Sequence, residues 1–153
     1  MRVAFDLDDT LIPCGQRFPV APPRYPWLAW ILATERLRVG TVEAVGLLRE
    51  AGHEVWVYTS SFRAALWIRL TFATYGLRLD GVVNQQRHDR ALGRTSHHHI
   101  KHPPAFDIAV LLDDSQAVAA EARGYGVVLM QEGDDLIERT RAAIELGLTL
   151  DHR

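Results

Sequence analysis

Five short apolar runs divide the chain, and longer amphipathic segments separate most of them. The runs are mostly continuous instead of alternating with polar positions, which is typical of parallel strands covered on both faces. They predict strands over residues 3–7, 55–59, 81–84, 108–112 and 127–130.

Helical spacing of apolar residues marks the segments between these runs. Thr41 and Ser115 are expected to cap two of the helices, and Asp134 or Asp135 opens the last one. The predicted helices cover residues 41–51, 62–75, 116–123 and 134–146. Strand and helix alternate, so we expect a Rossmann-like α/β fold, a doubly wound parallel sheet of about five strands with helices on both faces. The expected strand order is 3-2-1-4-5.

Two segments interrupt this alternation. Residues 13–26 contain five prolines and are too irregular for a helix. Residues 27–38 predict a helix that packs against the body of the protein, with a share in a lid as the alternative. We therefore expect one domain over residues 1–153 with a flap and helix inserted at about residues 13–38. The second interruption, residues 85–104, is polar and rich in histidine, and we expect a loop there.

Composition narrows the setting in which the protein works. The 153 residues include 48% hydrophobic and 24% charged residues, an ordinary globular balance, and the net charge is −2. This charge gives no clear signal for nucleic acid, and the apolar runs are too short for a bilayer, so no membrane partner is expected. Met1 and Arg2 lead straight into the first strand, unlike a secretory signal, and the one cysteine, Cys14, has no internal partner. Both features favour the cytoplasm.

Acids, hydroxyls and one lysine lie at or near the ends of three predicted strands. Since ligands bind at the carboxyl ends of the strands in such sheets, these side chains are expected at one rim. Carboxylates there can hold a hard cation such as Mg²⁺, and a hydroxyl with an ammonium can hold a phosphoryl group. The residues are Asp6 and Asp8, then Thr59 and Ser60, then Lys101, then Asp113 and Asp114.

This set of residues resembles the motifs of the haloacid dehalogenase-like (HAD) hydrolase superfamily. The stretch from Phe5 to Thr10, FDLDDT, resembles the first motif, and the strand that ends at Thr59 is similar to the second. Lys101 is similar to the third-motif lysine, and the residues VLLDD before Ser115 resemble the fourth motif. The resemblance covers about residues 3–130. The second aspartate in the first motif is similar to that of the family's phosphatases and phosphomutases, and we expect the phosphatase branch.

The resemblance implies a role for each residue. Asp6 would be the nucleophile that forms an aspartyl-phosphate, and Asp8 the general acid and then the general base. Thr59 would bind the phosphoryl group, and Lys101 would neutralise Asp6 and phosphate together. Mg²⁺ would be held by the Asp6 side chain, the Asp8 carbonyl and an acid of the fourth motif. We expect Asp114 as that ligand, with Asp113 orienting waters or the lysine. Asp9 is expected to have no chemical role.

The function expected from these roles is Mg²⁺-dependent hydrolysis of a phosphomonoester. The chain leaves little room for a cap domain over the site. The phosphorylated substrate could therefore be a macromolecule, or a small molecule that a partner subunit of a homo-oligomer covers. Further candidate substrate contacts are Thr10, Ser60, Arg17 and Arg24.

Other functions remain open. A phosphotransferase or phosphomutase shares the motifs but usually needs a cap that excludes water. A signalling receiver domain uses similar residues, but in a chain order that this sequence does not have. A catalytically silent or regulatory phosphate-binding protein on the same scaffold stays an alternative, because a fold alone does not determine function. The histidines at 97–99, with His102 near, lack the spacing of a zinc site, and His88 is expected to be an ordinary loop histidine.

Overall fold

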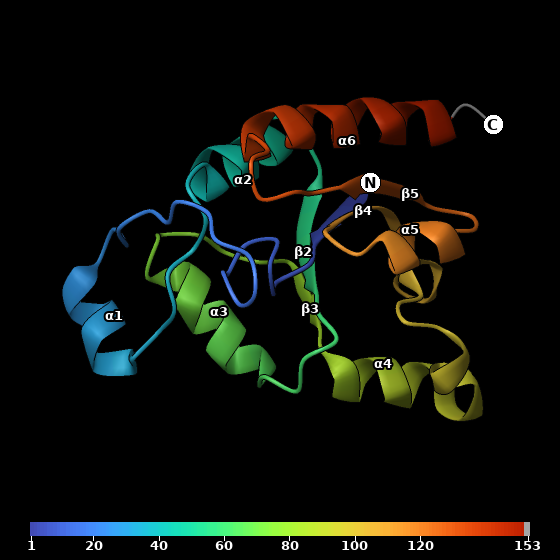
Figure 1. Ribbon diagram of the computed structural model, residues 1–153, viewed down its shortest axis with the longest axis horizontal. Coiled ribbons are helices and arrows are strands. Elements are labelled where there is room, and N and C mark those ends of the chain that lie inside the picture. The colour runs from blue at the N-terminus through green and yellow to red at the C-terminus, as the bar shows by residue number, and fades with distance from the viewer. Residues whose placement is uncertain (152–153) are drawn as a thin grey trace.

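The protein is built on one parallel β-sheet, here in a computed structural model that describes residues 1–151 (Figure 1). Every paired neighbour in the sheet is parallel, and the order is β3-β2-β1-β4-β5. The predicted fold class and strand order are therefore confirmed. The strands are β1 (Arg2–Phe5), β2 (Glu54–Tyr58), β3 (Gly81–Val83), β4 (Ile108–Asp113) and β5 (Gly126–Leu129).

Helices cover both faces of the sheet, as expected for a doubly wound fold. In Figure 1, α3 and α4 lie on opposite sides of β2 and β3, and α2 and α6 lie next to each other. The α-helices are α1 (Pro26–Leu32), α2 (Thr41–Glu50), α3 (Ala65–Ala73), α4 (Gln85–Leu92), α5 (Gln116–Glu121) and α6 (Leu136–Asp151). Two 3₁₀ helices, Gly93–His98 and Pro103–Phe106, precede β4.

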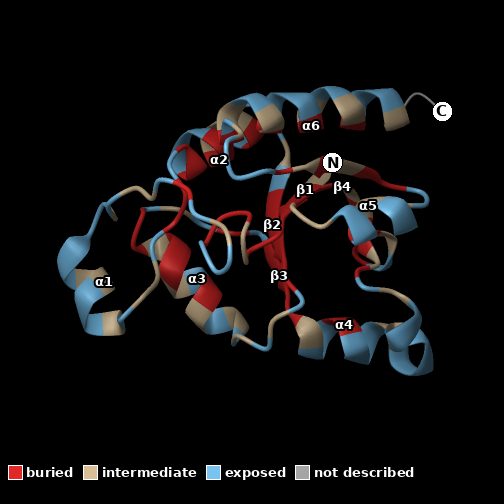
Figure 2. Ribbon diagram, in the orientation of Figure 1, coloured by how far each residue is buried: buried red, intermediate tan, exposed pale blue. Residues whose placement is uncertain are grey.

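The alternation of side chains along each strand separates two cores. Val3 and Phe5 of β1 pack in the larger core with apolar residues of α2, α3 and α6. Ala4, between them in sequence, packs in the smaller core on the other face, together with Trp56 and Tyr58 of β2. Most residues of β1 to β4 are buried, while β5 at the sheet edge alternates between buried and half-buried residues (Figure 2). This burial explains why the strands are visible in the sequence as continuous apolar runs.

Two of the predicted helix N-termini differ in the structure, and a third is confirmed. Gly40, with φ of 89°, is the N-cap of α2, and the Thr41 hydroxyl donates to the Arg38 carbonyl at 2.7 Å instead of capping the helix. The helix predicted from residue 62 begins only at Ala65, because the segment before it forms the loop that carries Arg63. Ser115 does cap α5, and its hydroxyl oxygen accepts from the Val118 amide.

Part of the segment predicted as a histidine-rich loop is helical. Asn84 caps α4 and accepts from the Arg87 amide at 3.0 Å. The apolar pattern did not reveal this helix because its buried residue is polar: His88 is only 1% exposed. The Nδ1 atom of His88 lies 2.5 Å from the Tyr58 hydroxyl, so the prediction of an ordinary loop histidine was wrong.

The helix of the insertion does not pack as its sequence predicts. α1 ends at Leu32, well short of residue 38, and Ala33 after it has a positive φ of 49°. None of the α1 residues is buried, and Trp27, Trp30 and Ile31 are exposed, so the expected packing against the body was wrong (Figure 2). Among residues 1–151, no helix combines the length and the apolar character needed to cross a membrane.

Candidate active site

The acids, hydroxyls and lysine predicted from the sequence meet at the carboxyl-terminal edge of the sheet. They surround a cavity of about 350 Å³ beyond the ends of β1, β2 and β4. A cavity of this size admits a small phosphoester or the phosphorylated end of a larger molecule. Its polar lining consists of Asp6, Asp8, Thr59, Ser60, Ser61, Lys101, Asp113, Asp114 and Ser115.

Lys101 joins the first and fourth motifs at the bottom of this cavity. Its Nζ lies 2.5 Å from Asp6 Oδ1 and 2.5 Å from Asp113 Oδ2, and all three residues are buried. Burial raises the pKa of Asp6 to about 7, although Lys101 opposes the shift, and Asp113 adds to it. Burial also works against the charge of Lys101, but the two carboxylates outweigh it and raise the lysine pKa. The lysine therefore remains a cation beside Asp6.

The acids of the first and fourth motifs form a set that fits a divalent cation. Asp6, Asp113 and Asp114 each offer an oxygen, and these oxygens lie within 4.8 Å of one another. An all-oxygen, carboxylate-rich set is the kind that Mg²⁺ prefers. Burial, together with the charge of Asp113, raises the pKa of Asp114, so a cation would relieve an unfavourable charge there.

The two fourth-motif acids differ in how fully their oxygens are used. Asp113 accepts from Lys101 through Oδ2 and from the Ser115 amide through Oδ1 at 2.9 Å. Asp114 accepts one long bond from Gln16 Nε2 at 3.4 Å. Asp114 is therefore the acid with free ligand capacity.

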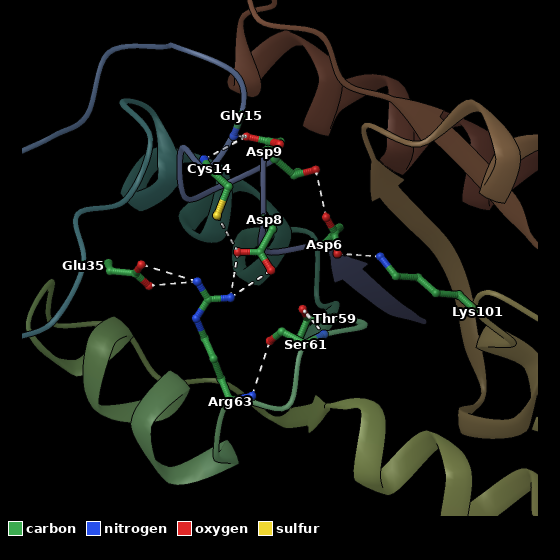
Figure 3. Close-up of polar contacts among 11 residues, drawn as sticks. Asp6, Asp8, Asp9, Cys14, Gly15, Glu35, Thr59, Ser61, Arg63 and Lys101 are labelled. Atoms are coloured by element: carbon green, nitrogen blue, oxygen red, sulfur yellow. Dashed lines mark hydrogen bonds and ion pairs between the residues drawn. The ribbon is translucent and has the colours of Figure 1, made fainter.

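Asp8 is held by an arginine that the sequence analysis did not single out. Arg63 Nη1 lies 2.6 and 2.8 Å from the two carboxylate oxygens of Asp8, and its Nη2 lies 3.2 Å from Glu35 Oε2 (Figure 3). The carboxylates raise the Arg63 pKa against the effect of burial, so it stays charged. Cys14 Sγ also contacts Asp8, at 3.1 Å. Arg63 is four positions after Thr59, and this place just beyond the second-motif strand was a signal in the sequence. Nothing in the sequence marked Glu35.

The turn after Asp8 is fixed by Asp9. This residue has a φ of 61°, and its Oδ1 accepts from the amides of Cys14, Gly15 and Gln16 at 2.6–2.8 Å. Burial alone would raise the Asp9 pKa, but the three bonds together outweigh it and lower the pKa. Asp9 therefore holds the loop shape that places Asp8.

A chain of buried hydrogen bonds connects the end of β2 to the segment that carries Lys101. The Tyr58 hydroxyl accepts from the His102 amide at 2.9 Å and contacts His88 Nδ1, while His88 Nε2 lies 3.2 Å from the Ser96 carbonyl. Burial raises the pKa of Tyr58 to about 12, so its hydroxyl keeps its proton and donates to Nδ1. The chain links β2 to the segment that carries Lys101.

Other predicted residues have different positions. Thr10 is buried and donates to Asp6 Oδ2 at 3.4 Å, and Ser60 lines the cavity. Arg17 and Arg24 are exposed and not part of the cavity wall, and Arg24 lies over the Tyr25 ring. Within residues 1–151, the three aspartates are the one group with metal-binding geometry, so the histidines at 97–99 do not form such a site.

Comparisons with known proteins place this fold. No family model and no curated protein sequence matches the chain. A crystal structure described as a HAD-superfamily hydrolase, subfamily IA, variant 1, from Geobacter sulfurreducens PCA, matches 95% of this chain and 98% of its own. The TM-score is 0.53 at 16% sequence identity. The chain has the HAD-like fold. On this fold, the acids described above occupy the carboxyl-terminal edge of β1 and β4.

Proposed function

We propose that this HAD-like chain is a Mg²⁺-dependent phosphomonoester hydrolase that acts through an aspartyl-phosphate on Asp6. The observation that carries the proposal is the meeting of Asp6, Lys101, Asp113 and Asp114 around one cavity with Thr59 on its wall. One lysine between two buried carboxylates is a costly arrangement that a merely structural core would not need. It suits a site that receives an anion and a divalent cation.

The side chains of this site divide the chemistry of hydrolysis between them. The Asp6 carboxylate attacks phosphorus and expels the alcohol, while Lys101 reduces the repulsion between the carboxylate and the incoming phosphate. Asp8 gives a proton to the leaving oxygen and later takes one from the water that hydrolyses the aspartyl-phosphate. Thr59, at the end of β2, offers its hydroxyl to a phosphoryl oxygen.

The site fits Mg²⁺ through Asp6 and Asp114, and the Asp8 carbonyl would complete the protein ligands. When bound, the cation would offset the charge of the phosphoryl oxygens. Asp113 serves instead to hold Lys101 in place, since its carboxylate is already shared between that lysine and the Ser115 amide.

The test is turnover of an aryl phosphate with Mg²⁺ and with EDTA. Asp6→Asn should lose at least about 10³-fold in rate, since it removes the nucleophile. Asp8→Asn should lose about 10²- to 10⁴-fold, the usual contribution of a general acid or base. Asp9→Asn is the matched control, because it makes the same change in the same loop outside the acid cluster, and should keep most of the activity. Absence of metal-dependent turnover over a broad panel of phosphoesters would contradict the proposal.

A further inference from the structure

The guanidinium of Arg63 is a cation at the side of the site where the alcohol part of a substrate would lie. In the proposed mechanism Asp8 gives its proton to the leaving oxygen, so any group in contact with Asp8 lies close to the alcohol. Arg63 makes the shortest contacts to Asp8, at 2.6 and 2.8 Å (Figure 3). Arg63 lies behind Asp8 and is not itself part of the cavity wall, so a charged group reaches this arginine only by extending past Asp8, a few bonds from the ester oxygen.

Arg63 is held in place by its own surroundings. Its amide donates to the Ser61 hydroxyl at 3.4 Å, and its carbonyl accepts from Asn84 Nδ2 at 3.0 Å. The guanidinium also lies 5.7 Å from the centre of the Trp67 ring. Such a fixed fork of donors suits a planar carboxylate, and it loses little conformational freedom on binding one.

The two carboxylates on Arg63 are unequal partners. Asp8 belongs to the nucleophile loop and contacts Arg63 at 2.6 Å, whereas Glu35 lies between α1 and α2 and stays 3.2–3.3 Å away. The Glu35 side chain is also the more exposed of the two, at 41% against 33%. Glu35 is therefore the partner that an incoming anion can displace, and its position shows that a carboxylate fits beside Arg63.

We propose that Arg63 binds a carboxylate on the alcohol part of the substrate in place of Glu35, so that the enzyme selects phosphomonoesters of hydroxy acids over those of neutral alcohols. The inference rests on the proposed function, which supplies the position of the leaving group. A hydroxy-acid ester exchanges one carboxylate on the guanidinium for another. An ester of a neutral alcohol leaves Glu35 in place and gains nothing from Arg63.

A matched pair of substrates tests this selection. 3-Phosphoglycerate and glycerol 3-phosphate share a carbon skeleton and differ by a carboxylate in place of a hydroxymethyl group. We measure the ratio of their kcat/KM values for each protein, since effects on Asp8 cancel within the ratio. The wild-type ratio should favour the acid, and Arg63→Gln should reduce this preference by about 10- to 100-fold, the value of a charge-assisted hydrogen bond. Arg63→Lys should keep part of it, with the change mainly in KM.

Glu35→Gln should move the ratio the other way, because it weakens the group that competes with the substrate. Arg141→Gln, on the exposed side of α6, is the matched control and should leave the ratio unchanged. A ratio that is the same within twofold in wild type and Arg63→Gln would overturn the inference and leave Arg63 as a positioning residue for Asp8.

Failure of the proposed function would show separately, as no hydrolysis of either ester by the wild-type protein. Binding then decides the inference, measured by calorimetry with Mg²⁺ and two phosphonates that cannot be hydrolysed. 3-Phosphonopropionate carries the carboxylate, and 3-hydroxypropylphosphonate carries a hydroxyl instead. Tighter binding of the first by wild type, lost in Arg63→Gln, supports the inference; equal binding of the two by the wild-type protein refutes it.

Discussion

Lys101→Met should destabilise the protein strongly, because it removes the cation that two buried carboxylates share. Asp6 and Asp113 are 6% and 1% exposed, and each has an oxygen 2.5 Å from the lysine Nζ. Methionine matches the length of the lysine stem, so the change is mainly one of charge. Loss of one partner from a buried ion pair costs about 3–5 kcal/mol. Domains of this size have about 5–15 kcal/mol of stability, so the variant should still fold.

Urea unfolding in EDTA at pH 7, followed by circular dichroism, measures this cost. The double variant Lys101→Met with Asp6→Asn should recover part of it, since only one buried carboxylate then lacks its cation. The cost should also shrink at pH 5, because burial favours the neutral carboxyl and already raises the pKa of Asp6 to about 7 beside the lysine. A loss below about 1 kcal/mol at pH 7 would place this pair among weak surface pairs and refute the reasoning.

Three further predictions follow from single groups. Asp9→Ala should lower the free energy of unfolding by about 1–3 kcal/mol in urea unfolding, because three amides lose their acceptor. Asp9→Asn should lower it by less in the same assay, because the Asn side-chain oxygen still accepts and Asn tolerates a positive φ. Arg38→Lys should lower the free energy of unfolding by about 1–3 kcal/mol in the same assay, since Arg38 Nη2 donates to the carbonyls of Gln131, Glu132 and Asp134. The matched control Arg139→Lys changes a more exposed ion pair and should lower it by less than about 1 kcal/mol. The rise in Tm caused by Mg²⁺ should be larger at pH 8 than at pH 6, because the carboxylate form of Asp6 that binds a cation forms as pH passes about 7. Differential scanning fluorimetry measures both rises, and equal rises at the two pH values would contradict this prediction.

The sequence predicts the sheet and the meeting of the first, second and fourth motifs for the same physical reason. A parallel strand covered on both faces must be apolar throughout, so each strand is visible as a run, and the polar residue that ends the run marks the rim. Asp6, Thr59 and Asp113 are each the residue at or just after a strand end. Their convergence follows once the strand order is known.

The apolar pattern of the sequence does not predict contacts between loops. The pair of Arg63 and Glu35 joins two loops whose approach depends on how the insertion folds back, and the apolar pattern carries no information about that. The same holds for α1, whose tryptophans predict burial but are exposed in the structure. α4 was missed for another reason: its buried face is carried by His88, which is held by a hydrogen bond and not by apolar contact.

The distribution of cations separates the two ends of the site. Lys101 serves Asp6 and Asp113, and Arg63 serves Asp8 and Glu35, so each protein cation bridges two carboxylates. Asp114 is left with one long contact from Gln16 and a pKa raised by burial, which makes it the acid that most needs a further cation. The site is thus short of positive charge at the phosphate end, where a divalent ion fits. At the alcohol end its charge is already shared with the half-buried carboxylate of Glu35, the group that a substrate carboxylate is proposed to displace. A metal ion at the first end and a substrate carboxylate at the second would meet both conditions, which makes the two proposals parts of one charge arrangement.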